Sequence, residues 1–299
     1  MKNMSLSHFI DRAMAEGKPL SQIFMEDESR ETGQHIASLK ERMAYRIHIM
    51  REALEKGLNS PQHSRSGYID GSAYRLLQYS AQGRSLLSPD LTQLLAYAMA
   101  IPEVNACMGR IVAAPTAGSC GVLPAVLFSI ARKKNMPDTL MIPAFFTAGG
   151  IGMVIEKKAT ISGAQGGCQA EIGSASAMAA GALVEMAGGN PEQSGHAVAF
   201  ALKNLMGLIC DPVGGLVEIP CVKRNALGAL NAVAAAEMAL AGLTSLFTAD
   251  QVIETMGKVG RRLPEEFRET AQGGLAALPR PVPPPRETGI PEVPSFLHK

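Results

Sequence analysis

Two long segments of this chain consist almost entirely of small, uncharged residues. They are residues 173–186 (GSASAMAAGALVEM) and residues 225–243, where alanine is again the commonest residue. Alanine favours helix, and small side chains let helix backbones approach closely. A helix that is apolar on nearly every side has to be buried. Because no segment alternates apolar and polar residues in the manner of a strand, we predict an all-α fold, a compact bundle of buried Ala/Gly-rich helices.

The pattern of apolar residues also predicts how the chain is organised. Residues 1–60 have apolar side chains at helical spacing and are expected to form peripheral helices, one of which ends with Gly57 as its C-cap. After a polar, turn-rich stretch, residues 70–278 are expected to form the core. Residues 1–278 would then make up a single all-helical catalytic domain, followed by a proline-rich tail at 279–299, which cannot continue a helix.

Charge and hydropathy bear on the partners and location of the protein. The net charge is +1, which gives no reason to expect a nucleic acid or an anionic membrane as partner. Residues 111–131 are uncharged and long enough to span a bilayer, but Pro115, Pro124 and a central TAGSCG stretch favour a buried loop flanked by buried helices. The first ten residues lack the apolar run of a secretory signal, so we expect a cytoplasmic protein with no membrane association.

Three of the five cysteines lie in glycine-rich segments of the second half. Cys168 lies in ISGAQGGCQAE, and Cys210 and Cys221 lie in NLMGLICDPVGGLVEIPCVKRN. The separations of 42 and 11 residues are unlike the short spacings of zinc ribbons and fingers, and buried cysteines are commonly inert core residues. The neighbouring glycines and prolines, however, favour irregular backbone whose N–H groups reach cluster sulfur atoms. Reduced thiols in a cytoplasmic protein would be available as metal ligands.

Three blocks of the sequence resemble the iron–sulfur-dependent bacterial L-serine dehydratases, specifically their alpha chain. The resemblance covers about residues 70–278 and is strongest at 105–124 (NACMGRIVAAPTAGSCGVLP), 161–180 (ISGAQGGCQAEIGSASAMAA) and 204–228. It implies a lyase, an L-serine ammonia-lyase that forms pyruvate and ammonia. It also implies a 4Fe-4S cluster held by three cysteines.

The spacing of the family's cluster ligands is reproduced here, which maps them onto Cys168, Cys210 and Cys221. Three thiolates leave one iron without a protein ligand, and such an open position suits a Lewis acid that assists departure of hydroxide. Cys107, on a predicted helix, and Cys120 are then packing residues. Cys120 as a fourth ligand would close the open iron and contradict this mechanism.

The carboxylate of serine needs a binding site, and the TAGSCG loop is our candidate. It precedes an apolar helical run that begins near Val122, and helix N-termini fed by glycine-rich loops bind anions. We expect Thr116, Gly118 and Ser119 to bind substrate, although the same residues also suit a simple tight turn. Lys223 and Arg224 could offset the negative charge of the cluster or form a solvated face.

The sequence does not identify the base that removes the α-proton of serine. Lys203, His196 and Glu171 are weak candidates. In the family, a second domain or a separate beta chain carries a His-Thr-x-Gly-Pro-Met type segment, which this sequence lacks. The resemblance therefore implies a separate beta subunit and a hetero-oligomer.

The C-terminal tail departs from a pattern found in part of the family. Some relatives end in a cysteine that occupies the open iron, whereas this chain ends in SFLHK. His298 could take that place, or stay on the surface, and Phe296 with Leu297 could anchor the tail.

Other functions are compatible with parts of the sequence. A cysteine desulfidase of the same domain family would use the same open iron. A pyridoxal phosphate dehydratase would need strand–helix alternation that this chain lacks. A non-catalytic metal-binding or interaction protein, for example with zinc bound by the three cysteines and His196, is the remaining alternative.

Overall fold

The computed structural model describes residues 4–283, and within that range it contains helices and no β-strand. The all-α prediction is therefore confirmed. The α-helices are the following: α1 (Leu6–Glu16), α2 (Leu20–Thr32), α3 (Ile36–Asn59), α4 (Ser72–Ala81), α5 (Pro89–Ala106), α6 (Val122–Lys133), α7 (Met141–Lys158), α8 (Gly163–Gly166), α9 (Ser174–Met186), α10 (Pro191–Leu205), α11 (Cys221–Leu240) and α12 (Ala249–Arg262).

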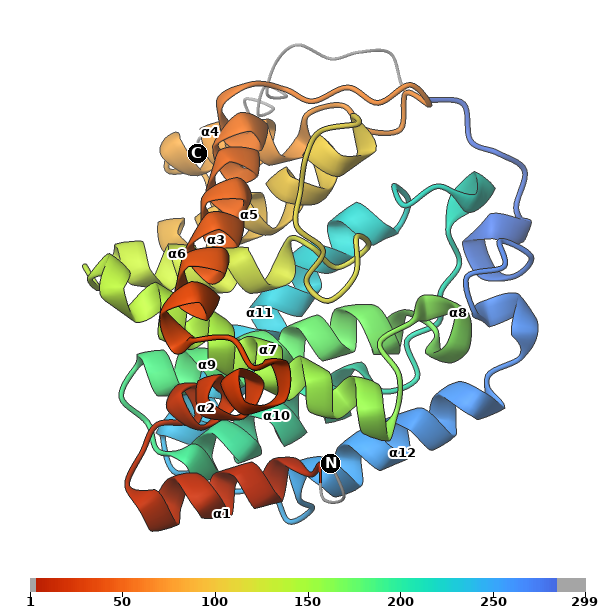
Figure 1. The fold of residues 1–299 in the computed structure, drawn as a ribbon. Coiled ribbons are helices and arrows are strands. Elements are labelled where there is room, and N and C mark those ends of the chain that lie inside the picture. The colour runs from red at the N-terminus through yellow and green to blue at the C-terminus, as the bar shows by residue number, and fades with distance from the viewer. Residues whose placement is uncertain (1–3, 284–299) are drawn as a thin grey trace.

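Helix α9 is the centre of the bundle, as its small-residue sequence predicts. Every residue of it except Glu185 is buried, and α6, α7, α10 and α11 pack around it (Figure 1). The backbones approach closely because glycines stand at the contacts. A Cβ on Gly152 of α7, for example, would lie 2.9 Å from the sulfur atom of Met178 in α9. Close packing of small residues thus replaces the aromatic core that this chain, with 5% aromatic residues, does not have.

The N-terminal helices cover the outside of this centre. Helix α2 packs on α7, and α3 packs mainly on α5. The carboxylate of Asp250 at the start of α12 accepts hydrogen bonds from the backbone N–H groups of Leu6 and Ser7, at 2.9 and 2.8 Å, and so ties α1 to α12. Gly57 was wrongly predicted as a C-cap: it lies inside α3, where a Cβ would lie 2.5 Å from the carbonyl oxygen of Ala100. The division of the chain into a catalytic domain and a tail stays a prediction.

Residues 111–131 form no membrane-spanning helix, as predicted, but a loop followed by the buried start of α6. Elsewhere among residues 4–283, the segment Asp138–Lys158, which includes α7, is long and apolar enough to cross a bilayer by length and composition. Of its most apolar window, 61% is buried inside the protein, and a core helix passes the same test.

The first residues of the proline-rich tail lie against two loops. The hydroxyl group of Tyr68 donates a hydrogen bond of 3.2 Å to the carbonyl oxygen of Pro281, and the Arg280 side chain lies beside Gly214. The suggested anchor at Phe296 and Leu297, and His298, lie outside the described residues.

Candidate metal centre

The three predicted cysteine ligands lie on irregular backbone or at a helix end. Cys168 follows Gly167, whose φ of +74° favours glycine, and precedes η2 (Gln169–Gly173), a π-helical turn. Such turns are rare and occur frequently at functional sites. Cys210 lies in the loop after α10, where its N–H group donates a 2.9 Å hydrogen bond to the carbonyl oxygen of Phe267. Cys221 is the first residue of α11.

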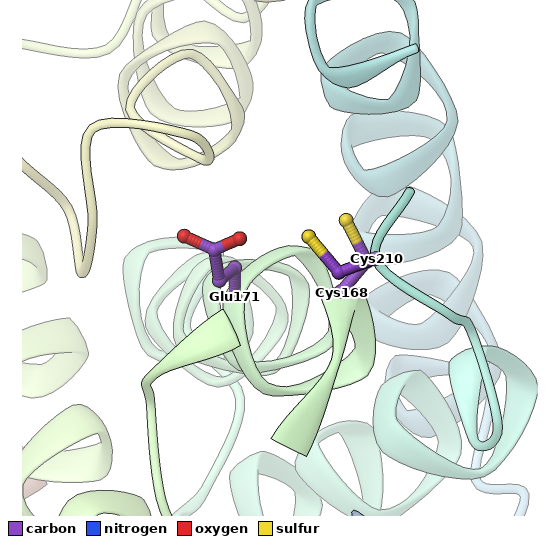
Figure 2. A group of neighbouring side chains, drawn as sticks. All are labelled: Cys168, Glu171 and Cys210. Carbon is purple, nitrogen blue, oxygen red and sulfur yellow. The ribbon is translucent and has the colours of Figure 1, made fainter. Parts of the chain in front are cut away.

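The thiols of Cys168 and Cys210 meet beside the carboxylate of Glu171. One ligand atom from each of these three buried residues lies within 4.8 Å of the other two. Figure 2 shows that the Glu171 carboxylate and the Cys168 sulfur atom point to the same side of their helical segment, and that the Cys210 sulfur atom, from a separate loop, lies beside that of Cys168. Cys221 is 4% exposed and lies outside this group of three. It is near enough to Cys168 for a charge on Cys168 to raise the pKa of Cys221. The structure therefore brings the predicted cysteines into one region.

Electrostatics make the three thiols unequal. A hydrogen bond from Cys210 lowers the pKa of Cys168, and the positive charge of Arg224 acts in the same direction. The same hydrogen bond, together with burial, raises the pKa of Cys210. Burial raises the pKa of Cys221 to about 12. Of the three thiols, Cys168 is the one whose pKa is lowered, and it is the one beside Arg224.

Arg224 is a cation of this region, and Lys223 is not. The guanidinium group of Arg224 is held by Asp211 at 2.8 Å and by the carbonyl oxygen of Ile209 at 2.9 Å, and it lies beside Cys168. Lys223 instead lines a separate cavity of about 420 Å³ with Arg75 and other residues of α4, α5 and α11. Arg224 can therefore offset thiolate charge, whereas Lys223 points elsewhere.

The predicted substrate loop lies against Glu171. The hydroxyl group of Thr116 donates a 2.6 Å hydrogen bond to Oε1 of Glu171 and lies 3.1 Å from Oγ of Ser119. A Cβ on Gly118 would lie 3.1 Å from the same carboxylate oxygen, so a larger residue there would press on it. Burial raises the pKa of Glu171 to about 7, and the neighbouring charge of Glu269 acts in the same direction.

The expected anion site at the start of α6 is only partly available. The N–H group of Gly121 donates to Oδ1 of Asn225 at 3.0 Å, and that of Val122 donates to the carbonyl oxygen of Ser119 at 3.2 Å. The N–H groups of Gly118 and Ser119 form no hydrogen bond within residues 4–283. Donors for a carboxylate are therefore provided by the loop itself more than by the helix terminus.

Glu269 is a residue of this region that sequence reasoning missed. A Cβ on Gly163 would lie 2.7 Å from Oε2 of Glu171 and 2.8 Å from Oε2 of Glu269, so both carboxylates approach this glycine. Glu269 has a φ of +62°, which is uncommon for a residue with a side chain, and its N–H group donates to the carbonyl oxygen of Cys210 at 3.3 Å. No motif marks it, because its position depends on a contact with a residue 59 positions earlier in the chain.

The other two candidate bases lie apart from the cysteines. The ring Nδ1 of His196 accepts a hydrogen bond from the N–H group of Ser245, and Lys203 donates to Oγ of the same serine at 3.0 Å. His196 is therefore not placed to complete a zinc site with the cysteines. Cys107 is the C-cap of α5, one residue beyond the helix, and Cys120 is fully buried. Both positions agree with packing roles.

Comparison with known proteins identifies the family. The sequence profile of the family described as serine dehydratase alpha chain matches residues 15–276. The chain is 50% identical over 260 residues to the probable L-serine dehydratase, alpha chain, of Bacillus subtilis (strain 168), covering 87% of this chain and 86% of that one. It is 44% identical over 267 residues to the L-serine dehydratase, alpha chain, of Peptoniphilus asaccharolyticus, covering 89% and 91%.

A longer relative matches through part of its length. The L-serine dehydratase of Streptomyces coelicolor (strain ATCC BAA-471 / A3(2) / M145) is 42% identical over 236 residues, which cover 76% of this chain and 51% of that protein. The match of the profile to most of the chain, together with the two relatives of similar length, places this protein in the serine dehydratase alpha chain family.

Proposed function

We propose that this chain is the alpha chain of an L-serine dehydratase, which removes water from L-serine and releases pyruvate and ammonia. One observation carries the proposal: in a member of this family, buried cysteines, a buried carboxylate and a hydroxyl-bearing loop converge on one region. The reaction needs each of them. A base takes the α-proton, a Lewis acid assists departure of the β-hydroxyl group, and donors hold the carboxylate of the substrate.

We further propose Cys168, Cys210 and Cys221 as ligands of a 4Fe-4S cluster. The donor set fits this cofactor, because thiolates are the usual ligands of such clusters and all three sulfur atoms are shielded from water. Arg224 offsets part of the negative charge that three thiolates bring into a buried position. When bound, a cluster with three cysteine ligands supplies one iron that polarises the β-hydroxyl group as a Lewis acid.

Glu171 is our choice for the base. A base works best when its pKa lies near the working pH, and burial raises the pKa of Glu171 to about 7. The hydrogen bond from Thr116 to Oε1 fixes the orientation of the carboxylate and leaves Oε2 for the α-proton of serine. Once this proton and the hydroxyl group have left, 2-aminoacrylate remains, which tautomerises to the imine and hydrolyses to pyruvate and ammonia.

The carboxylate of the substrate is assigned to the 116–121 loop. The hydroxyl group of Ser119 and the N–H groups of Gly118 and Ser119 are donors within one short segment, and the hydroxyl group of Thr116, which donates its proton to Glu171, lies 3.1 Å from Oγ of Ser119. An anion bound there would lie next to Glu171, because Thr116 of this loop is hydrogen-bonded to the Glu171 carboxylate. The two ends of serine would thus be held close to the base and the cysteines.

A separate beta chain completes our proposal. The relatives from Bacillus and Peptoniphilus are called alpha chains, and the Streptomyces relative is about twice as long as the part that this chain matches. We infer that a second polypeptide supplies what that additional length provides, so that the active enzyme is a hetero-oligomer. All five cysteines are free thiols, the state that a reducing cytoplasm maintains, and we propose that location.

The test is an anaerobic purification of this chain together with the beta chain. Iron, acid-labile sulfide and pyruvate formed from L-serine are then measured. We expect about four irons per alpha chain and pyruvate formation that is lost with the iron. Full activity in iron-free protein would refute the cluster, and activity that depends on added pyridoxal phosphate would indicate the other class of dehydratase.

Two matched cysteine variants test the ligand assignment. Cys168→Ser should abolish the cluster absorbance and the activity, whereas Cys107→Ser should retain both, because Cys107 lies at the end of α5. Release of sulfide from L-cysteine, in place of pyruvate from L-serine, would identify a cysteine desulfidase. A protein that holds iron but converts neither substrate would be a metal-binding protein without this activity.

A further inference from the structure

Asn225 connects the 116–121 loop to the helix that begins with Cys221. It lies one turn into α11, and its side chain is completely buried. Its Oδ1 accepts a hydrogen bond from the N–H group of Gly121 at 3.0 Å, and its Nδ2 donates to the carbonyl oxygens of Gly118 at 2.8 Å and Cys221 at 2.9 Å. One side chain thus joins two points of the loop to the residue proposed as a cluster ligand.

The bond to the carbonyl group of Gly118 fixes the orientation of the next peptide unit. In a trans peptide the C=O and N–H groups point in opposite directions. Because the carbonyl oxygen of Gly118 points to Asn225, the N–H group of Ser119 points away from it. That N–H group has no partner within the part of the chain that the structure describes. It is one of the donors that we assign to the substrate carboxylate.

We propose that Asn225 is a positioning residue that presents the N–H group of Ser119 to the carboxylate of the substrate. Because Asn225 is also hydrogen-bonded to Cys221, it fixes the position of this N–H group relative to Cys221. The inference rests on the proposed function for the identity of the substrate. Asn225 itself does not touch the substrate. A buried amide suits this role, because it both accepts from and donates to the loop without placing a charge beside the cysteines.

The test compares two positions on the same helix. Asn225→Ala removes all three hydrogen bonds. Asn231→Ala is the matched control: the Nδ2 of Asn231 also donates two bonds of 2.9 Å, but to Ser176 and to the carbonyl oxygen of Ala201, away from the loop. We expect the KM for L-serine to rise about tenfold or more in Asn225→Ala, with kcat changed much less and iron and sulfide retained. The control should leave KM within about twofold.

A second variant covers the case in which the alanine variant does not fold. In Asn225→Ser the shorter side chain can still donate to the carbonyl oxygen of Cys221, four residues earlier in the helix, but it cannot reach the loop. The same rise in KM is expected. An unchanged KM in folded protein of either variant would overturn the proposal.

Hydrogen exchange provides a readout that needs neither cluster nor activity. In the cluster-free chain, the amide of Gly121 should exchange faster in Asn225→Ala than in the wild type and stay unchanged in Asn231→Ala. An unchanged exchange rate of the Gly121 amide in Asn225→Ala would show that Asn225 does not hold the 116–121 loop, and would refute the proposal. A different outcome is faster exchange in Asn225→Ala while no preparation, wild type included, forms pyruvate from L-serine. In that case the role of Asn225 in holding the loop is supported and the proposed function fails.

Discussion

At the scale of single residues, substitution of Glu171 is expected to have the largest effect on kcat. General bases contribute typically 10²–10⁴-fold to a rate. Glu171→Gln should therefore lower kcat by about 10²–10⁴-fold while iron and sulfide content stay unchanged. Glu185→Gln is the matched control, since burial also raises the pKa of Glu185, a half-buried residue of α9 whose carboxylate accepts a hydrogen bond from the N–H group of Ser21 in α2. A variant of Glu171 that keeps full activity would exclude it as the base.

The same residue predicts the pH dependence of the reaction. A base has to be ionised, and the pKa of Glu171 is raised to about 7. The value of kcat/KM should thus fall about tenfold for each pH unit below 7 and level off above it. A profile measured from pH 5.5 to 8.5, with iron content checked at each pH, decides this. A flat profile would contradict the assignment.

Glu103 offers a prediction on stability that is independent of the reaction. It is completely buried in α5, its Oε1 accepts a hydrogen bond from the N–H group of Ala73, and its Oε2 has no hydrogen-bond partner among residues 4–283. Burial raises the pKa to about 7 from 4.5, so the folded chain binds this proton more tightly than the unfolded chain, and stability falls as pH rises between these values.

The variant Glu103→Gln removes this penalty. At pH 8 it should be more stable than the wild type by about 1–3 kcal/mol, and the difference should shrink toward pH 5. Denaturant unfolding of the cluster-free chain at both pH values measures it. A variant that is equally destabilised at both would show that the ionised form is better accommodated than its burial implies.

At the scale of helices, two adjacent glycines of α7 allow the effect of tertiary packing on stability to be measured separately from the effect of helix propensity. A Cβ on Gly150 would overlap the ring of Phe24, whereas a Cβ on Gly149 would meet nothing within 4 Å. Gly150→Ala should cost about 1–3 kcal/mol through overpacking, and Gly149→Ala should gain about 0.5–1 kcal/mol through helix propensity. Melting temperatures of the two variants test the pair. A loss of equal size in both would point to the helix itself and not to the contact.

Helices could be predicted from the sequence where residues within the same segment determine the helix. Small-residue composition identified α9 and α11, because alanine acts within its own segment. The end of α3 was misplaced, since the reason for Gly57 is its contact with Ala100, which no local pattern reveals. In the candidate site, the cysteines were found through a resemblance to known proteins. Glu269 and Asn225 were missed because each acts through contacts made only on folding.

At the scale of the whole molecule, the candidate site is assembled from distant parts of the chain. The 116–121 loop, η2, the 210–221 segment and residues 267–269 converge although about 150 residues separate the first from the last. A site assembled in this way forms only when the helices of the bundle have packed together. The family profile likewise matches residues 15–276 and is not limited to a short motif.

The attachment of Cys210 has a consequence for biosynthesis. Cys210 is held by the carbonyl oxygen of Phe267 and the N–H group of Glu269, residues that the ribosome adds almost sixty positions later. While those residues are still inside the exit tunnel, Cys168, Cys210 and Cys221 have all been synthesised, but Cys210 does not yet have the two backbone partners that hold it. We therefore expect iron delivered to the nascent chain to meet the three proposed ligands before Cys210 is fixed in place, so that a cluster at this proposed site would be inserted after residues 267–269 have folded against it.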